Sequence, residues 1–231
     1  MRKRRWILVS LLAVTVLLGG CKNKKEVARY ELGKLGVEYS PESLMKCARY
    51  DDYLPIKFML KAGIDPNQKD AGGNSALMIA INNRCSRAVV QLVKGGVDIK
   101  QVDSSGNTPL HLAVNTESVD MVQVLLNAGA PIDVRNNEGA TPLYCASWRG
   151  QDSIVKELLN RNAGVNIANN NGTTPLMAAA YFGRTQTVKA LIVKNADLVA
   201  RDSTGKTALG YATESKAEDI VRILEASNAK M

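Results

Sequence analysis

The sequence is poor in the residues from which most enzyme active sites are built. It contains one histidine, His111, and four cysteines among 231 residues. A Ser-His-Asp triad or a zinc site would have to rest on that histidine, because the cysteines do not cluster at metal-ligand spacing. Paired acids and a nucleophile elbow are also missing. We therefore expect a protein that is not an enzyme and that needs no metal or cofactor.

The sequence also lacks a cluster of basic residues. Its formal net charge is +8, and four of these charges lie within residues 2–5. The other Lys and Arg residues are scattered among Asp and Glu, whereas nucleic-acid binding needs a basic stripe, usually with aromatic residues. Nucleic acid is therefore not an expected partner, and neither is a small-molecule substrate.

No apolar run is long enough to cross a bilayer comfortably, which takes ~20 residues. The longest run covers residues 6–18 and follows the basic start of the chain, as in an export signal. It ends in Leu18-Gly19-Gly20-Cys21, which resembles the lipobox of bacterial lipoproteins, where the cysteine is diacylated and becomes the mature N-terminus. The alternative is an ordinary signal anchor that ends near a cysteine.

The lipobox resemblance implies a signal peptide over residues 1–20 and lipidation of Cys21. Lys22, rather than Asp, follows this cysteine, which by analogy with bacterial lipoprotein sorting favours the periplasmic face of the outer membrane over the inner membrane. Residues 21–39 are expected to form a lipid-anchored tether that leads into a first partial helix. Within it Lys22, Lys24 and Lys25 are best interpreted as a solvated spacer.

One leucine recurs every 33 residues, which predicts an all-α repeat solenoid. Turn-forming Asp or Asn and then Gly precede it, followed by Thr and Pro, residues that suit a hairpin, a helix N-cap and a first helical turn. A second apolar pattern at i, i+3, i+4 spacing predicts another helix, which ends at Gly or Asn. The period places its leucines at Leu44, Leu77, Leu110, Leu143, Leu176 and Leu209.

The segment Thr108-Pro109-Leu110-His111-Leu112-Ala113 closely resembles the ankyrin repeat. The resemblance covers about residues 40–228 and implies about six repeats, with degenerate ends that face water, in a domain expected over residues 40–231. Repeat boundaries are expected near 40–69, 70–102, 103–135, 136–168, 169–201 and 202–228.

Three isolated features have a structural and a functional interpretation. His111 is expected to tie adjacent loops by hydrogen bonds rather than to act in catalysis. Cys47 and Cys145 are expected to be small core residues, whereas Cys85, in a turn, is open to interpretation as a reactive thiol. Residues 203–207 look like the end of a phosphate-binding loop, but Ala200 occupies the place of the first glycine, so nucleotide binding is not expected.

Ankyrin proteins generally bind partners with their hairpin tips and with the exposed face of each first helix. Trp148, Tyr181 and Phe182 are unusual at such positions, because a helix that needs only solubility would not place them outward. The alternative is that they pack against the loop of the next repeat. The full set of expected partner-binding residues is Tyr50, Asn82, Asn83, Ser105, Asn107, Asn115, Thr116, Arg135, Glu138, Trp148, Arg149, Asn171, Tyr181, Phe182 and Arg201.

The resemblances together suggest a protein-binding lipoprotein that faces the periplasm and meets the membrane only through its N-terminal lipid. Small ankyrin lipoproteins resemble immunity proteins that neutralise lipase effectors delivered by type VI secretion. The expected partner is thus a phospholipase-type toxin. The alternatives are a stress-protective accessory, similar to periplasmic ankyrin proteins that support catalase, and an envelope scaffold.

Overall fold

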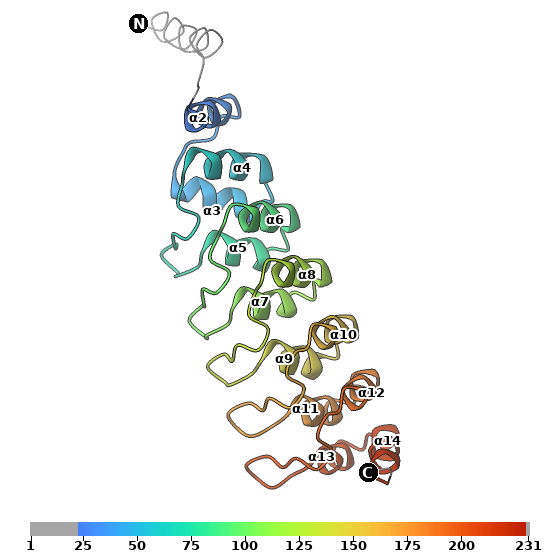
Figure 1. Ribbon diagram of the computed structural model, residues 1–231. Helices are drawn as coiled ribbons and strands as arrows, with labels where there is room; N and C mark the ends of the chain where they lie inside the picture. Colours follow the sequence, from blue (N-terminus) through green and yellow to red (C-terminus); the bar gives the residue numbers. More distant parts are fainter. Residues whose placement is uncertain (1–22, 230–231) are drawn as a thin grey trace, which may run out of the picture. The chain divides into compact units, whose positions relative to one another are not determined.

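The computed structural model describes residues 23–229, so the predicted signal peptide and Cys21 lie outside the described residues. Within them the chain has thirteen helices and no strands, which confirms the predicted all-α repeat solenoid (Figure 1). No helix in this part of the chain combines the length and the apolar character that crossing a bilayer requires. The helices are α2 (Lys24–Lys34), α3 (Pro41–Arg49), α4 (Tyr53–Ala62), α5 (Ala76–Asn82), α6 (Ser86–Lys94), α7 (Pro109–Asn115), α8 (Val119–Asn127), α9 (Pro142–Arg149), α10 (Asp152–Asn160), α11 (Pro175–Tyr181), α12 (Thr185–Val193), α13 (Ala208–Glu214) and α14 (Glu218–Asn228).

The described helices fall into two compact units. The first unit comprises residues 23–80 and 87–97 and contains α2, α3, α4 and most of α5 and α6. The second comprises residues 81–86 and 98–229 and contains α7 to α14. In the second unit each odd-numbered helix pairs with the even-numbered helix that follows it, and pairs stack on pairs (Figure 1).

The Thr-Pro dipeptides begin helices as the sequence predicts. Thr108, Thr141 and Thr174 are extended N-cap residues whose side-chain oxygens accept a backbone N–H three residues later, and a proline occupies the first turn of each helix. Thr207 caps α13 in the same way without a proline. Each cap satisfies an amide that the helix itself leaves without a partner, which stabilises by about 1 kcal/mol.

The second helices end where left-handed residues were expected. Gly63, Gly96 and Gly129 have φ between 80° and 92°, and Asn162 and Asn195 have φ near 61°. A left-handed residue turns the chain out of the helix and lets it bond the last free carbonyls. The hairpin that leads to the next repeat follows directly.

The core runs through the positions of the 33-residue period. Leu110, Leu143 and Leu176 are at most 1% exposed, and the small residue three places after each is fully buried, so the paired helices approach closely. Removing such a leucine side chain typically costs 2–5 kcal/mol. Leu209, in the last repeat, is half-buried. That difference fits a terminal repeat with water on its outer side.

The N-terminal segment is more extensively folded than the expected tether with a partial helix. Eleven residues form α2, which is capped by the Asn23 side chain and packs against α4 with Ala28 and Leu32 buried. The hydroxyl of Tyr39 then donates to the carbonyl oxygen of Ala62 at 3.3 Å. The folded part of the chain therefore begins before residue 40.

Candidate functional site

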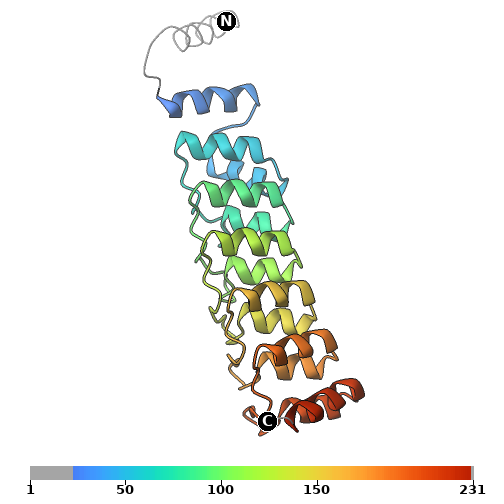
Figure 2. The same cartoon turned by 45° about the vertical axis from the view of Figure 1, so that its right-hand side comes forward.

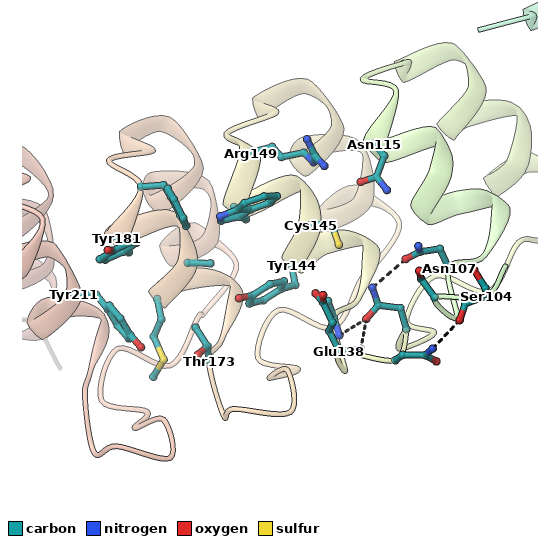
Figure 3. Close-up of a pocket in the computed structure, with 18 residues that line it drawn as sticks. Ser104, Asn107, Asn115, Glu138, Tyr144, Cys145, Arg149, Thr173, Tyr181 and Tyr211 are labelled. Atoms are coloured by element: carbon teal, nitrogen blue, oxygen red, sulfur yellow. Dashed lines mark hydrogen bonds between the residues drawn. The ribbon is translucent and has the colours of Figure 1, made fainter. Parts of the chain in front are cut away.

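A groove of about 650 Å³ lies on the second unit, along its first helices and the hairpins that precede them (Figure 3). Helices α7, α9, α11 and α13 all contribute to it. Aromatic and sulfur-containing side chains form the middle, and hydroxyl and amide side chains from the hairpins form one edge. An apolar floor with a polar rim is the usual arrangement of a protein-binding surface.

Three aromatic rings near the ends of α9 and α11 form a contiguous cluster. Phe182 meets Trp148 at 5.5 Å and Tyr181 at 5.0 Å between ring centroids, both edge to face. Tyr181 makes a third such contact with Tyr211, at 5.7 Å. The rings thus pack on one another, yet Trp148, Tyr181 and Phe182 each remain 40–42% exposed. Packing within the protein therefore accounts for only part of their surface.

Two tyrosines join the first helices to the hairpins beneath them. The amide of Asn169 donates to the hydroxyl of Tyr144 at 3.1 Å, and the Tyr211 hydroxyl donates to Asp202 at 2.5 Å. Burial raises the pKa of Tyr144, and the bond to Asp202 raises the pKa of Tyr211. Both phenols therefore stay neutral at physiological pH, and each presents an apolar ring to the groove.

The hairpin edge of the groove is ordered by side-chain amides. The Asn137 amide donates to the carbonyl of Ser104 at 3.1 Å, and the Asn170 amide repeats this bond to the carbonyl of Asn137 at 2.9 Å. Asn136 donates to Asn107 Oδ1 at 3.0 Å (Figure 3). Because successive tips hold one another, a partner meets a rim that is already ordered, which lowers the entropic cost of binding.

The groove has one charged group at each edge. The Arg149 guanidinium lies 5.0 Å from the Trp148 ring, and Asn115 lies beside it at the helix edge (Figure 3). Glu138 stands on an exposed hairpin tip. Neither Arg149 nor Glu138 forms an ion pair with another residue between 23 and 229. Both charges therefore face solvent and remain available to a partner.

The sequence predicts that Cys145 is a core residue. In the structure its side chain is only partly buried and lines the groove. Burial of its thiol raises its pKa to about 11, so the thiol is protonated at neutral pH and is a poor nucleophile. Cys47 is buried, as predicted, and no disulfide joins Cys47, Cys85 and Cys145. Among the described residues no group of His, Cys, Asp and Glu is arranged to hold a metal ion.

The groove brings together more than half of the expected partner-binding residues. Eight of the fifteen line it, namely Ser105, Asn107, Asn115, Glu138, Trp148, Arg149, Tyr181 and Phe182. Tyr50 instead lines a separate hollow on the first unit, and Asn82 and Asn83 are exposed residues outside the groove. Thr116 and Asn171 also lie outside it, Thr116 as the C-cap of α7.

Arg135 and Arg201, which the sequence places among the partner-binding residues, do not line the groove. Each binds the backbone of its own hairpin, Arg135 at the carbonyl of Gly139 (3.0 Å) and Arg201 at the carbonyl of Gly205 (2.8 Å). Each guanidinium thus spans the turn to the glycine four residues later. Both residues therefore stabilise hairpins.

Two further interpretations are resolved by local geometry. His111 is fully buried and links Thr108 to the carbonyl of Ala140 in the next repeat, which confirms its structural role. Cys85 is only 6% exposed, so a reagent has little access to its thiol. That burial argues against the reactive-thiol interpretation.

Tyr144, Tyr211 and Met177 line the groove but were not among the expected residues. Tyr144 and Met177 occupy the same register position as His111, the third residue of the first helix. Since His111 reaches the hairpin of the next repeat, its register position predicts that Tyr144 and Met177 each border the hairpin of the repeat that follows them. Tyr211 is one place further along in its repeat, so the register gives no such prediction for it.

The family model for ankyrin repeats (3 copies) matches residues 44–136, 77–169 and 147–231. The chain is an ankyrin-repeat protein. No curated protein matches it. Ankyrin repeats are protein-interaction modules and generally act as non-enzymatic scaffolds, so a protein partner is the ligand class that this fold indicates.

Proposed function

We propose that this ankyrin-repeat protein binds a protein partner in the groove of its second unit. The observation that carries the proposal is the cluster of Trp148, Tyr181 and Phe182, three large rings each about two-fifths exposed at one place. Rigid aromatic side chains bury much area at a small entropic cost, which is why they dominate interface energetics. The opposed charges of Arg149 and Glu138 would fix the direction in which a partner segment lies.

We further propose that the protein is lipidated at Cys21 and held at the periplasmic face of the outer membrane. The lipobox-like Leu18-Gly19-Gly20-Cys21 and the following Lys22 support this proposal. Labelling of the native host with a palmitate analogue should mark the wild-type chain and leave Cys21→Ser unmarked. A wild-type chain without label would refute the lipid anchor.

The finer proposal is that the partner is a phospholipase-type toxin delivered by type VI secretion, which the groove neutralises stoichiometrically. Its support is the resemblance of small ankyrin lipoproteins to immunity proteins, together with the proposed location at the membrane, since such toxins attack phospholipid. The exposed groove suits occlusion of an active-site mouth or immobilisation of a lid. In this proposal the protein acts by binding the toxin and catalyses no reaction itself.

The test is affinity capture of tagged residues 22–231, exported to the periplasm of the native host, with mass spectrometry of the bound proteins. A stoichiometric lipase toxin supports immunity. A catalase, an assembly factor or no partner at all refutes it and leaves the stress-protective accessory or the envelope scaffold.

The groove itself is tested with the variants Trp148→Ala and Tyr181→Ala against the captured partner. Each should weaken binding by 2 kcal/mol or more, about thirtyfold, as expected of interface hot spots. Val193→Ala, which truncates a 78% exposed side chain at the end of α12, serves as the control. Unchanged binding by both aromatic variants would show that the interface lies elsewhere.

A further inference from the structure

The even-numbered helices of the two units differ in net charge. In the first unit α2, α4 and α6 carry eight Lys and Arg residues and two Glu residues, a net charge of +6, and α4 and α6 have no acid at all. In the second unit α8, α10, α12 and α14 carry three basic and six acidic residues, a net charge of −3. The positive charge of the described residues is therefore concentrated on one helix layer.

These cations are exposed, and most have no acidic partner. All eight are solvent-accessible. Lys34 pairs with Glu31 and Arg87 pairs with Asp51. The other six form no ion pair with any residue between 23 and 229, namely Lys24, Lys25, Arg29, Lys57, Lys61 and Lys94. Their field is consequently not neutralised within the layer.

The three helices lie side by side (Figure 2). Helix α2 packs on α4. The end of α6 adjoins α4 so closely that a Cβ atom on Gly95 would lie 2.5 Å from the Leu60 side chain. We define α2, α4 and α6 as the basic layer. It also carries apolar surface, since Leu54 is 41% exposed on α4.

The covalent chain ties this layer to the predicted anchor. Cys21 and Lys24 are three residues apart, and an extended chain spans at most ~3.6 Å per residue, so their Cα atoms lie within about 11 Å. If Cys21 is acylated, as proposed above, its acyl chains lie in the bilayer. Helix α2 then begins at the level of the lipid headgroups, and the first unit cannot leave the membrane surface.

We propose that the basic layer docks on an anionic phospholipid surface. Lys and Arg side chains near such a surface each gain about 1 kcal/mol from its negative potential. Their aliphatic stems, together with Leu54, cover the apolar part of the headgroup region while the charged ends meet phosphates. Acylation supplies attachment, and the basic layer supplies orientation. The proposal rests on lipidation of Cys21 for its place in the cell, but the affinity for anionic lipid is a property of the layer alone.

The test uses the unacylated chain from residue 22 on, which contains every described helix, and sedimentation with lipid vesicles. At low ionic strength it should bind vesicles of phosphatidylcholine with about one third phosphatidylglycerol at least ~tenfold more tightly than pure phosphatidylcholine. Raising the salt to about 0.5 M should abolish the difference, because exposed charges are then screened within a few ångströms.

Matched double variants locate the surface. Lys57→Glu with Lys61→Glu changes the charge of the basic layer by four, and should lower binding to the anionic vesicles at least about tenfold. Lys156→Glu with Lys189→Glu makes the same change on α10 and α12 of the second unit, and should alter binding less than about twofold. All four side chains are exposed, and thermal unfolding followed by circular dichroism verifies that both variants fold.

Equal binding to the two kinds of vesicle, or equal loss in the two double variants, would overturn the proposal. The assay contains neither an acyl chain on the protein nor a protein partner. A negative result here therefore leaves the lipid anchor and the groove untouched. Conversely, a chain that is not acylated in the host fails the palmitate test and not this one.

Discussion

The buried imidazole of His111 lies 3.0 Å from the carbonyl oxygen of Ala140, at the start of the next repeat. Because that oxygen can only accept, Nε2 carries the hydrogen, and Nδ1 is left to accept from the backbone N–H of Thr108 at 3.2 Å. The neutral ring thus satisfies a carbonyl and an amide in two successive repeats. A charged ring would turn an N–H of its own toward the Thr108 amide.

We predict that His111→Ala lowers the free energy of unfolding by about 1–3 kcal/mol, because the buried N–H of Thr108 loses its acceptor and the Ala140 carbonyl keeps only its bond from the Asn136 N–H. Urea denaturation followed by circular dichroism measures the loss. His111→Leu fills the volume of the imidazole but makes no hydrogen bond, so it should recover only part of the stability that His111→Ala loses. A loss below about 0.5 kcal/mol in His111→Ala would contradict the bridging role.

The same bridge predicts a pH dependence. Burial lowers the pKa of His111 from its usual 6.5, so the unfolded chain binds a proton at a higher pH than the folded chain. The contribution of His111 to stability is therefore complete above pH 6.5 and is lost as the pH falls below it toward the lowered pKa. Between pH 7 and pH 5 the wild type should lose more stability than His111→Leu, and parallel curves would refute this.

Close packing of hairpins predicts that equivalent glycines differ in sensitivity. Gly139 and Gly205 occupy the same place in their turns, with φ of 76° and 81°. A Cβ on Gly139 would lie 2.6 Å from the backbone nitrogen of Asn170 in the next hairpin, whereas one on Gly205 would meet nothing within 4 Å. The last hairpin therefore serves as a natural control for the strain of positive φ.

Accordingly, Gly205→Ala should cost about 1 kcal/mol, the typical penalty for a left-handed alanine. Gly139→Ala should cost at least about 2 kcal/mol more, because the backbone of the neighbouring hairpin must also move. Thermal and urea unfolding of the two variants give the comparison. Equal losses would mean that the hairpins separate at little cost.

Much of this fold was predictable because the helix caps, turns and core positions of each repeat depend on residues close together in the sequence. The leucine period and the Thr-Pro caps depend only on sequence neighbours, and Leu110, Thr108 and Gly129 lie as expected. The groove was less predictable, because its members meet only after repeats have stacked. The aromatic cluster illustrates this, since Trp148 of α9 and Phe182, at the end of α11, meet only when the two repeats pack together.

The contact between Tyr211 and Asp202 gives a prediction that can be read by NMR. The Tyr211 hydroxyl is the first cause of the strongly lowered pKa of Asp202, with the Thr204 hydroxyl and the backbone amides of Thr204 and Lys206 adding to it. Tyr211→Phe should therefore raise the pKa of Asp202 toward its usual 3.8, measured from the carboxyl carbon shift. Thr213→Ala, whose hydroxyl bonds only the carbonyl of Leu209, should leave that pKa unchanged.

The lowered pKa of Asp202 also determines how the stability of the protein changes with pH. Because the pKa of folded Asp202 lies below that of the unfolded chain, its contribution is present above about pH 4 and is lost as the pH falls through the folded value. Tyr211→Phe should narrow the stability difference between pH 5 and pH 2. An unchanged pKa in Tyr211→Phe would show that the hydroxyl does not bond the carboxylate in solution.

The thiol of Cys145 gives a chemical probe of the groove. Burial raises its pKa to about 11, two units above its usual 9.0, so the thiolate is about a hundredfold scarcer at pH 8 than for an ordinary thiol. Iodoacetamide should modify Cys145 about a hundredfold more slowly than a small-molecule thiol with a pKa of 9, if its access is otherwise equal. Peptide mass spectrometry of the chain from residue 22 on measures this rate at Cys145 separately from Cys47 and Cys85.

A variant of a neighbouring aromatic residue tests whether burial in the groove causes this slow reaction. Trp148→Ala should open the groove above Cys145, return its pKa toward 9, and raise the alkylation rate at pH 8 several-fold, since Trp148 and Cys145 line the same cavity. Val193→Ala, remote from this cavity, should leave the rate unchanged. A wild-type rate equal to that of the free thiol would mean that water reaches Cys145 freely. The groove would then be too open to hold a partner side chain in a desolvated pocket, and binding would have to rest on its polar rim.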